Sequence, residues 1–257
     1  MRVALLEADP DLGAGLAGED LEAARQRAVA AVIDVDGPDW DQASICQAAQ
    51  DGWLGLFLLG GLMIRRITVG KRAACELFGP GDLIRPWDTD GEYDPLPISV
   101  DWLVLRPTRL AVLDTAFALQ IARWPSVTSR IVARVAQRAR YLALTQAVNH
   151  LPRVYARLLI LFWLLAERWG TVRRDGVHVR LPLTHEVLGM LVGARRPTVT
   201  TALQRLTRSG LLARERPDHW LLTKRAIECL RTPESLELID DGGQGAGGPD
   251  PLLPGHQ

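Results

Sequence analysis

The side chains best suited to chemistry in this 257-residue chain gather in one stretch, residues 183–212. Most of them are hydrogen-bond donors on a segment with helical periodicity: Arg195, Arg196, Thr198, Thr200, Thr201, Gln204 and Arg205. Guanidinium, hydroxyl and amide groups in such a cluster contact phosphates and the edges of bases in a DNA major groove. The stretch therefore predicts binding to double-stranded DNA, with Arg196 as the best candidate for reading a base.

Catalysis and metal binding have no comparable support in the sequence. The three cysteines, Cys46, Cys75 and Cys229, lie far apart, without C-x-x-C spacing or a Cys/His cluster of the kind that binds zinc. Neither a Ser/His/Asp arrangement nor a pair of carboxylates stands in a catalytic motif. We expect His178 and His185 at the surface. The sequence thus predicts no enzyme, no metal site and no cofactor, with thiols that stay reduced and inert.

Two short helices must position the donors. The first begins after Thr184, a candidate N-cap residue, and its apolar face is Leu188, Leu191 and Val192. The second ends at Gly210, and its buried face is Val199, Ala202, Leu203 and Leu206. Gly193 between them suits the left-handed conformation of a tight turn, and Pro197 suits the first turn of a helix.

The spacing of three residues indicates how the helices are joined. Gly189, a small residue where the helices approach closely, is followed by Gly193 and then by Val199, which is helix-turn-helix spacing. Residues 211–223 predict a β-hairpin in the position of a wing, with Arg214 and Arg216 near its tip. Arg214 joins the predicted DNA contacts. The alternative is a helical hairpin that docks another protein.

The first half of the chain predicts a small β-barrel or sandwich. Short β-type runs over 54–59, 62–69, 73–78, 98–105 and 110–113 are separated by turn signals such as Gly60-Gly61 and Arg106-Pro107-Thr108. Residues 18–31 predict an amphipathic helix. Residues 86–97, rich in proline and acids, predict a loop.

Helical patterns follow. A long helix over 125–148 carries an apolar stripe, made of Ile131, Val132, Val135, Ala136, Ala139, Leu142 and Ala143. The stripe packs either on the chain's own barrel or on a second copy of the helix. A helix over 153–169 ends at Gly170, and a hairpin over 172–181 follows. The glycine- and acid-rich end from 232 predicts a mobile tail.

The charge distribution supports a polyanion partner. The chain has 30 cations and 30 anions, yet residues 125–230 hold 18 cations and 6 anions, whereas residues 1–124 hold 11 and 19. The basic charge follows the predicted helices and wing, so that half of the chain is the one expected to meet DNA.

A membrane location is not expected. The longest apolar run after the amino terminus, residues 158–166, is too short for a bilayer that needs about 20 residues, and the acids near Met1 do not fit a signal peptide. The sequence predicts a soluble, cytoplasmic protein.

Residues 183–212 resemble the carboxy-terminal domain of Crp/Fnr-type bacterial transcription regulators, the relatives of the cyclic-AMP receptor protein. The order of parts over roughly residues 40–230 is similar too, including a glycine turn at 78–82. The resemblance implies an α+β fold with a cupin-like β-roll of the cyclic-nucleotide-binding type (1–123), a dimerisation helix (124–149), a winged helix-turn-helix (150–230) and a disordered tail (231–257).

The resemblance also implies partners. It implies a homodimer that binds a two-fold symmetric operator, with RNA polymerase as a further partner. The dimer contacts would come from the long helix, at Ile131, Val132, Val135, Ala139 and Leu142.

The chain departs from the family where a cyclic nucleotide would bind. The expected pocket is Gly81, Asp82, Arg85, Trp87 and Glu92, but the stretch 83–97 lacks the family's Arg-Ser-Ala or Arg-Thr-Ala cassette and holds four acids. Acids without a partnering cation repel a phosphate. We expect a degenerate sensor that does not take cyclic AMP. A true nucleotide sensor, with the acidic loop folding away on binding, is the alternative.

A second departure concerns the base-reading residues. The family's helix begins Arg-Glu-Thr-Val and carries a second arginine, whereas here Pro197 replaces the glutamate and Thr201 replaces that arginine. Proline cannot accept a hydrogen bond from cytosine, and threonine cannot pair with guanine in the bidentate way that arginine does. The operator is therefore expected to differ from the family's common one.

Overall fold

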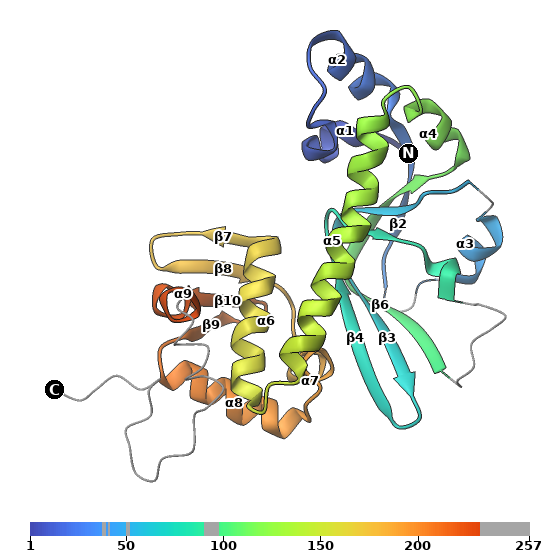
Figure 1. The fold of residues 1–257 in the computed structure, drawn as a ribbon. Coiled ribbons are helices and arrows are strands. Elements are labelled where there is room, and N and C mark those ends of the chain that lie inside the picture. The colour runs from blue at the N-terminus through green and yellow to red at the C-terminus, as the bar shows by residue number, and fades with distance from the viewer. Residues whose placement is uncertain (38–39, 41, 50–51, 90–97, 232–257) are drawn as a thin grey trace, which may run out of the picture. The chain divides into compact units, whose positions relative to one another are not determined.

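The computed structural model describes residues 1–37, 40, 42–49, 52–89 and 98–231, and its chain divides into two compact units (Figure 1). The first is Met1–Tyr141 and the second Leu142–Gln257. The boundary falls within helix α5, Pro125–Asn149, which confirms the predicted long helix. The predicted tail lies outside the described residues.

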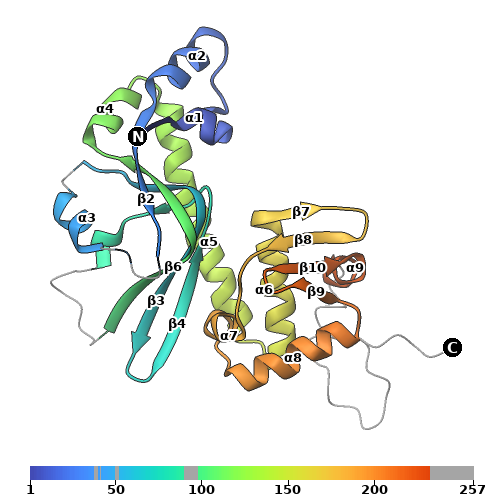
Figure 2. The ribbon, with the colours of Figure 1, turned by 180° about the vertical axis from the view of Figure 1, so that it is seen from behind.

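The first unit is a β-roll built on one antiparallel sheet (Figure 2). Its strands are β1 (Arg2–Ala4), β2 (Val29–Val35), β3 (Gly55–Val69), β4 (Arg72–Phe78), β5 (Leu83–Ile84) and β6 (Ile98–Leu113). They are paired in the order β1-β2-β6-β3-β4, with β5 on β3. The smaller elements are α1 (Leu5–Ala8), a 3₁₀ turn (Pro10–Gly13), α2 (Gly18–Arg27), α3 (Gln42–Ala48), a 3₁₀ turn (Pro86–Thr89) and α4 (Thr115–Ile121).

The predicted turns at Gly60-Gly61 and Arg106-Pro107-Thr108 are wrong, because strands β3 and β6 continue through them. The register of the β3–β6 pair shifts between Leu58 and Gly60 and again between Gly60 and Leu62. Gly61 has φ +94°, and a Cβ there would clash with the backbone of Thr108. The glycine pair therefore forms a bulge, which bends a strand without ending it.

The helix predicted over 18–31 is also too long. Helix α2 ends at Arg27, and Val29 begins strand β2, which pairs with both β1 and β6. The β-branched residues Val29, Val32 and Ile33 favour a strand once neighbouring strands offer backbone partners.

The core of the roll has two parts. One lies between the sheet and the flanking helices and includes Leu5, Leu12, Phe117, Val127 and Ile131. The other lies inside the roll and includes Leu56, Met63, Phe78 and Trp102. Phe78 and Trp102 have ring centroids 5.0 Å apart, so Trp102 packs in this core.

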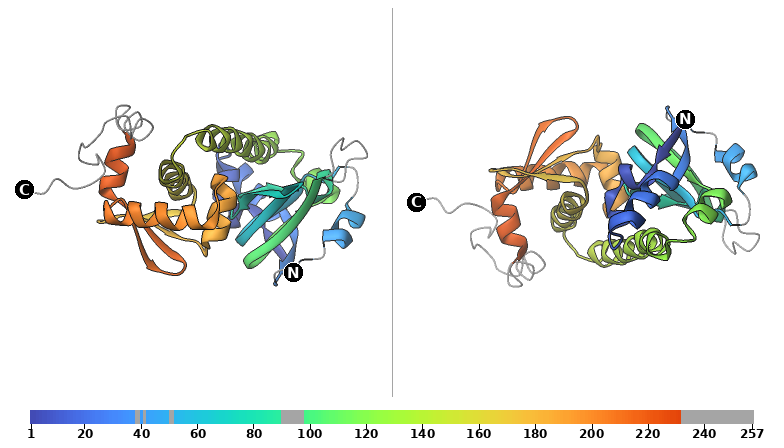
Figure 3. Two further views of the ribbon diagram at one scale, coloured as in Figure 1. Left: turned by 90° about the horizontal axis from the view of Figure 1, so that it is seen from below. Right: turned by 90° about the horizontal axis from the view of Figure 1, so that it is seen from above.

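The second unit is a helical layer with a small antiparallel sheet. Its helices are α6 (Val154–Trp169), α7 (His185–Val192), α8 (Arg196–Arg208) and α9 (Lys224–Arg231), and its strands are β7 (Gly170–Val172), β8 (Gly176–Arg180), β9 (Leu212–Arg216) and β10 (His219–Thr223). The sheet order is β7-β8-β10-β9. The predicted hairpin, paired short helices and wing are confirmed, and Figure 3 shows the β9–β10 wing projecting beside α8.

Gly170 ends α6 without taking the left-handed conformation that is common after the last residue of a helix. Its φ and ψ of −79° and 152° are extended, and the residue opens strand β7. A Cβ at Gly170 would clash with the carbonyl oxygen of Ala166 and with Val177, so close approach requires the glycine there.

None of the helices in the described part of the chain is both long enough and apolar enough to cross a membrane.

Candidate nucleic-acid interface

Local interactions form the turn between α7 and α8. Gly193 takes the left-handed conformation, with φ 64° and ψ 36°, and the backbone N–H of Ala194 donates to the carbonyl oxygen of Gly189 at 2.8 Å. A Cβ on Gly189 would lie 2.6 Å from the carbonyl oxygen of Ala194, so Gly189 is small because the turn folds back onto it. The Thr184 hydroxyl accepts from the N–H of Val187 at 3.2 Å, which confirms the predicted N-cap.

Side chains outside the motif hold the end of α7. Arg157 of α6 donates to the carbonyl oxygen of Val192 at 3.1 Å, and Asn149 donates to that of Leu191 at 3.3 Å. The last carbonyls of a helix lack partners within it, so these donors satisfy them and orient the turn. Sequence spacing carried no signal of either contact.

Helix α8 separates its apolar and polar residues cleanly. Val199 and Leu206 are fully buried, and Ala202 and Leu203 nearly so. The opposite face carries five of the predicted contact residues, all exposed: Arg195, Arg196, Thr198, Thr201 and Gln204. Their side chains are therefore accessible to a ligand outside the protein, and the Thr201 hydroxyl also donates to the carbonyl oxygen of Pro197 at 3.3 Å.

Two of the predicted contacts are turned toward the protein instead. The Thr200 hydroxyl donates to the carbonyl oxygen of Arg196 at 3.0 Å, and the Arg205 guanidinium carbon lies 3.9 Å from the centroid of the Tyr155 ring. Arg205 thus makes a cation–π contact with α6 and is half-buried. Both residues therefore stabilise α8 through contacts within the protein.

His185 is a functional candidate that the sequence prediction placed at the surface without a role. It is half-buried, and its Nδ1 lies 2.9 Å from the Thr200 hydroxyl oxygen. Because that hydroxyl already donates to Arg196, Nδ1 of His185 must be the donor. Burial, and then the charges of Arg214 and Arg196, lower the pKa of His185, which keeps its ring neutral.

The wing brings its own cation to the same surface. Arg214 donates to the carbonyl oxygen of Pro217 in the turn, and its guanidinium carbon lies 4.6 Å from the centroid of the Trp220 ring. Trp220 is buried, so it fixes the stem of an exposed arginine. Arg214 and Arg196 both lie close enough to His185 to lower its pKa, so the wing and the start of α8 place two cations near the same side chain.

The expected ligand pocket is occupied by contacts within the chain. The carboxylate of Asp82 accepts from the N–H of Gly79 at 2.8 Å, which closes the glycine turn. Arg85 donates to the carbonyl oxygen of Trp53 at 2.7 Å and lies 5.4 Å from the Trp87 ring. Gly81 has φ +88°, and a Cβ built on it would lie 3.8 Å from Nη1 of Arg134. Glu92 lies outside the described residues.

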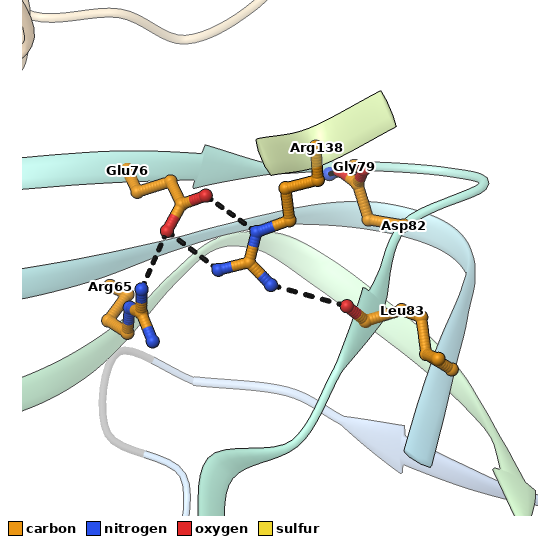
Figure 4. A network of polar contacts seen from close by, with 6 residues as sticks. All are labelled: Arg65, Glu76, Gly79, Asp82, Leu83 and Arg138. Carbon is orange, nitrogen blue, oxygen red and sulfur yellow. Dashed lines mark hydrogen bonds and ion pairs between the residues drawn. The ribbon is translucent and has the colours of Figure 1, made fainter. Parts of the chain in front are cut away.

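An arginine of α5 crosses behind this turn (Figure 4). Nε and Nη2 of Arg138 lie 2.6 and 2.7 Å from the two carboxylate oxygens of Glu76, which is 8% exposed. Arg138 also donates to the carbonyl oxygen of Leu83 at 3.3 Å, and Arg65 donates to Glu76 at 2.9 Å. Both of these guanidinium groups are thus paired with one carboxylate of the protein itself, that of Glu76.

The apolar stripe of α5 is divided between two environments. Ile131 is 1% exposed and belongs to the core of the roll, so it is not available to a partner. The other residues of the stripe are exposed, and among them Val132, Val135 and Leu142 are 58%, 46% and 39% exposed. A row of apolar side chains at helical spacing in water marks an interaction surface.

The expectation that His178 lies at the surface is wrong. His178 is 4% exposed, with Nε2 2.9 Å from a carboxylate oxygen of Asp175 and Nδ1 2.9 Å from Nε2 of His219. The cysteines are half-buried and form no disulfide in the described residues, and burial raises the pKa of Cys75 to about 12.

A β-roll followed by a long helix and a winged helix-turn-helix defines a class of DNA-binding regulator. Residues 152–228 match the family described as the Crp-like helix-turn-helix domain. The comparisons thus support the resemblance to Crp/Fnr-type regulators that the motif and the order of parts indicated.

Two relatives illustrate the similarity in sequence. Over 152 residues the chain is 27% identical to the "CRP-like cAMP-activated global transcriptional regulator" of Mycobacterium tuberculosis, covering 59% of this chain and 66% of that protein, just under two thirds of its length. Over 180 residues it is 29% identical to "Regulatory protein CysR" of Synechococcus elongatus, covering 68% and 75%. Both names denote regulators, in agreement with the prediction that the chain is not an enzyme.

Solved structures show the same fold. A cyclic nucleotide-binding domain containing protein from Listeria monocytogenes matches 75% of this chain and 88% of its own, with a TM-score of 0.59 and 13% identity. FixK2 from Bradyrhizobium japonicum matches 84% and 99%, with a TM-score of 0.56 and 15% identity.

Proposed function

We propose that the chain is a homodimeric, sequence-specific transcription regulator whose β-roll does not respond to cyclic AMP. One observation carries the DNA-binding part: exposed donors line the outer face of α8, and the wing arginine Arg214 extends the same electropositive surface. An α-helix fits the DNA major groove, and arginine and threonine side chains on its outer face can contact phosphates and base edges there.

Binding to DNA from the chain's own promoter region should weaken steeply as salt rises. Each neutralised phosphate releases counterions, so about six phosphate contacts per dimer imply a loss of about 10³-fold in affinity between 50 and 200 mM salt. Fluorescence anisotropy of a labelled promoter fragment measures this directly. The Arg195→Ala variant is the matched test of one phosphate contact per copy, because it should reduce the salt slope of the dimer by about two.

Binding that does not change with salt, or no binding to any genomic fragment, would contradict the proposal. A protein that fails to shift DNA yet captures a protein partner would favour the adaptor alternative instead. Selection of bound genomic fragments followed by sequencing gives the operator, and a two-fold symmetric motif supports both specificity and dimerisation.

The homodimer is proposed from the exposed stripe of α5. Substituting Val135→Glu places a charge in a surface that would be buried between two copies, so the variant should be monomeric at concentrations where the parent chain is a dimer. Sedimentation velocity measures this. Gln137→Glu is the control, since Gln137 is exposed on the same helix and off the stripe. A Val135→Glu chain that stays dimeric would place the interface elsewhere.

Independence from cyclic AMP is proposed from the pocket contacts. Within residues 83–89 the one cation is Arg85, which is bonded to Trp53, and the two arginines of the neighbouring network are paired with Glu76. A cyclic phosphate would have to displace these contacts. Calorimetric titration with cyclic AMP and cyclic GMP decides between this and the sensor alternative, because measurable heat with a rise in melting temperature would overturn it.

The division into modules, the cytoplasmic location and the contact with RNA polymerase are proposed from the resemblance to Crp/Fnr-type regulators. The β-roll (1–123), dimerisation helix (124–149) and winged helix (150–230) would act as separate modules in the cytoplasm. The DNA-bound dimer would present a surface to RNA polymerase.

A further inference from the structure

A row of four titratable side chains crosses the small sheet of the second unit. Its ends are carboxylates, Asp175 in the β7–β8 turn and Glu215 on β9, and its middle is His178 on β8 and His219 on β10. His178 lies 2.9 Å from Asp175 and 2.9 Å from His219, and Nδ1 of His219 lies 3.1 Å from a Glu215 oxygen. The side chains of His178 and His219 are 4% and 12% exposed. The row is therefore shielded from water at its centre.

Proton counting shows that two neutral histidines would leave this row short of one positive charge. An ionised carboxylate only accepts hydrogen bonds, so Nε2 of His178 and Nδ1 of His219 must each carry a proton. A neutral imidazole has a single N–H group. The two nitrogens that face each other, Nδ1 of His178 and Nε2 of His219, then both present lone pairs at 2.9 Å. Two lone pairs at that distance repel each other unless a cation lies beside them.

We propose that His178 and His219 bind a divalent transition-metal ion through these two facing nitrogens, with the Glu215 carboxylate available as a third ligand. Ligand atoms of the three residues all lie within 4.8 Å of one another. Histidines that bind a metal usually donate their other ring N–H to a carboxylate, as His178 does to Asp175 here. Glu215 would exchange its contact with Nδ1 of His219 for the ion. The two carboxylates also supply the negative charge that a divalent cation requires.

Binding such an ion requires the two rings to turn and to separate slightly. Metal–nitrogen bonds of about 2.05 Å to nitrogens 2.9 Å apart enclose an angle of about 90°, and an opening of about 0.4 Å would make it tetrahedral. Glu215 is 43% exposed and stands at the β-bulge next to the wing turn, so its side chain has room to rotate. Water would complete the coordination.

Two arginines lie on the strands next to His219. Arg180 and Arg216 are the cross-strand partners of His219 and share its side of the sheet. Both are exposed, so solvent screens their charges, whereas the carboxylates contact the histidines directly. The arginines lower the affinity for a cation without occupying its position.

The ion would join the β7–β8 hairpin to both strands of the wing. If the chain binds DNA as proposed above, a bound ion would hold the wing and Arg214 in place; this consequence rests on the proposed function. The metal site itself does not, because it can be measured without DNA.

The test uses the full chain, freed of metal with EDTA and titrated with ZnCl₂. We expect one Zn²⁺ per chain by calorimetry, a rise in melting temperature, and visible absorption bands when Co²⁺ replaces Zn²⁺. His219→Gln should lower the Zn²⁺ affinity at least about 100-fold, and Glu215→Gln about 10- to 100-fold. Glu215 is exposed enough that its variant should fold even if a histidine variant does not.

His150→Gln is the matched control, because His150 is exposed and lies outside the row. It should bind Zn²⁺ as the parent chain does. Three results would overturn the proposal: no Zn²⁺ uptake, uptake that persists in both His219→Gln and Glu215→Gln, or a melting temperature that follows pH while Zn²⁺ has no effect. The last result would mean that a shared proton supplies the missing charge.

Discussion

Replacing Arg196 by alanine is expected to lower the affinity for the cognate operator by about 5- to 150-fold per half-site, or about 1–3 kcal/mol. Arg196 is exposed at the first turn of α8, with the wing arginine Arg214 beside the same surface. An arginine at the start of a reading helix can make two hydrogen bonds to one guanine, and alanine makes neither. The loss should therefore be confined to the cognate sequence.

Competition binding with operators changed at one base pair measures this effect. The parent chain should discriminate strongly at one position of each half-site, and Arg196→Ala should bind all four bases there nearly equally. Arg195→Ala provides the comparison, since loss of a phosphate contact weakens every sequence alike. An equal loss for Arg196→Ala on random DNA would make Arg196 a phosphate contact instead.

Replacing Glu76 by glutamine is expected to destabilise the β-roll by about 2–3 kcal/mol. Glu76 is 8% exposed and forms ion pairs with two arginines, Arg138 and Arg65, whose side chains are 18% and 21% exposed. Removing one partner of a buried ion pair typically costs about 3–5 kcal/mol, because the other charge is left without compensation. Partial solvent access to both arginines lowers the expected cost to about 2–3 kcal/mol, below that range.

Urea unfolding followed by tryptophan fluorescence measures the change in the free energy of unfolding. Asp101→Ala is the matched control, because it removes an ion pair of the same roll, Arg66–Asp101, whose side chains are 39% and 47% exposed. Exposed pairs contribute little, so this variant should lose less than about 1 kcal/mol. A Glu76→Gln chain as stable as the parent would mean that the guanidinium of Arg138 is adequately solvated without its partner.

The helix-turn-helix was predictable because its determinants are local. The left-handed Gly193, the proline near the start of α8 and the Thr184 cap act within a few residues of their own position in the chain. Helical periodicity then separated the buried face of α8 from its exposed face. The same locality explains why the long helix and the wing hairpin were predicted within a few residues of their observed bounds.

The errors fall where distant segments meet. Gly60-Gly61 has the composition of a turn, yet pairing with β6 keeps the strand continuous and makes the glycines a bulge. Residues 29–31 continue a helical pattern, yet β1 and β6 provide partners that favour a strand. Local patterns describe preferences, and backbone pairing over long separations overrides them.

The sequence by itself determined the class of protein, the position of the motif and the direction of its polar face, because these depend on spacing along one chain segment. Only the tertiary structure decided that Arg205 turns inward to Tyr155, that Arg138 reaches Glu76, and that His178 meets His219. Each of these pairs is separated by more than 40 residues of chain. Strand register and helix packing brought their members within contact distance, and neither can be read from spacing along one segment.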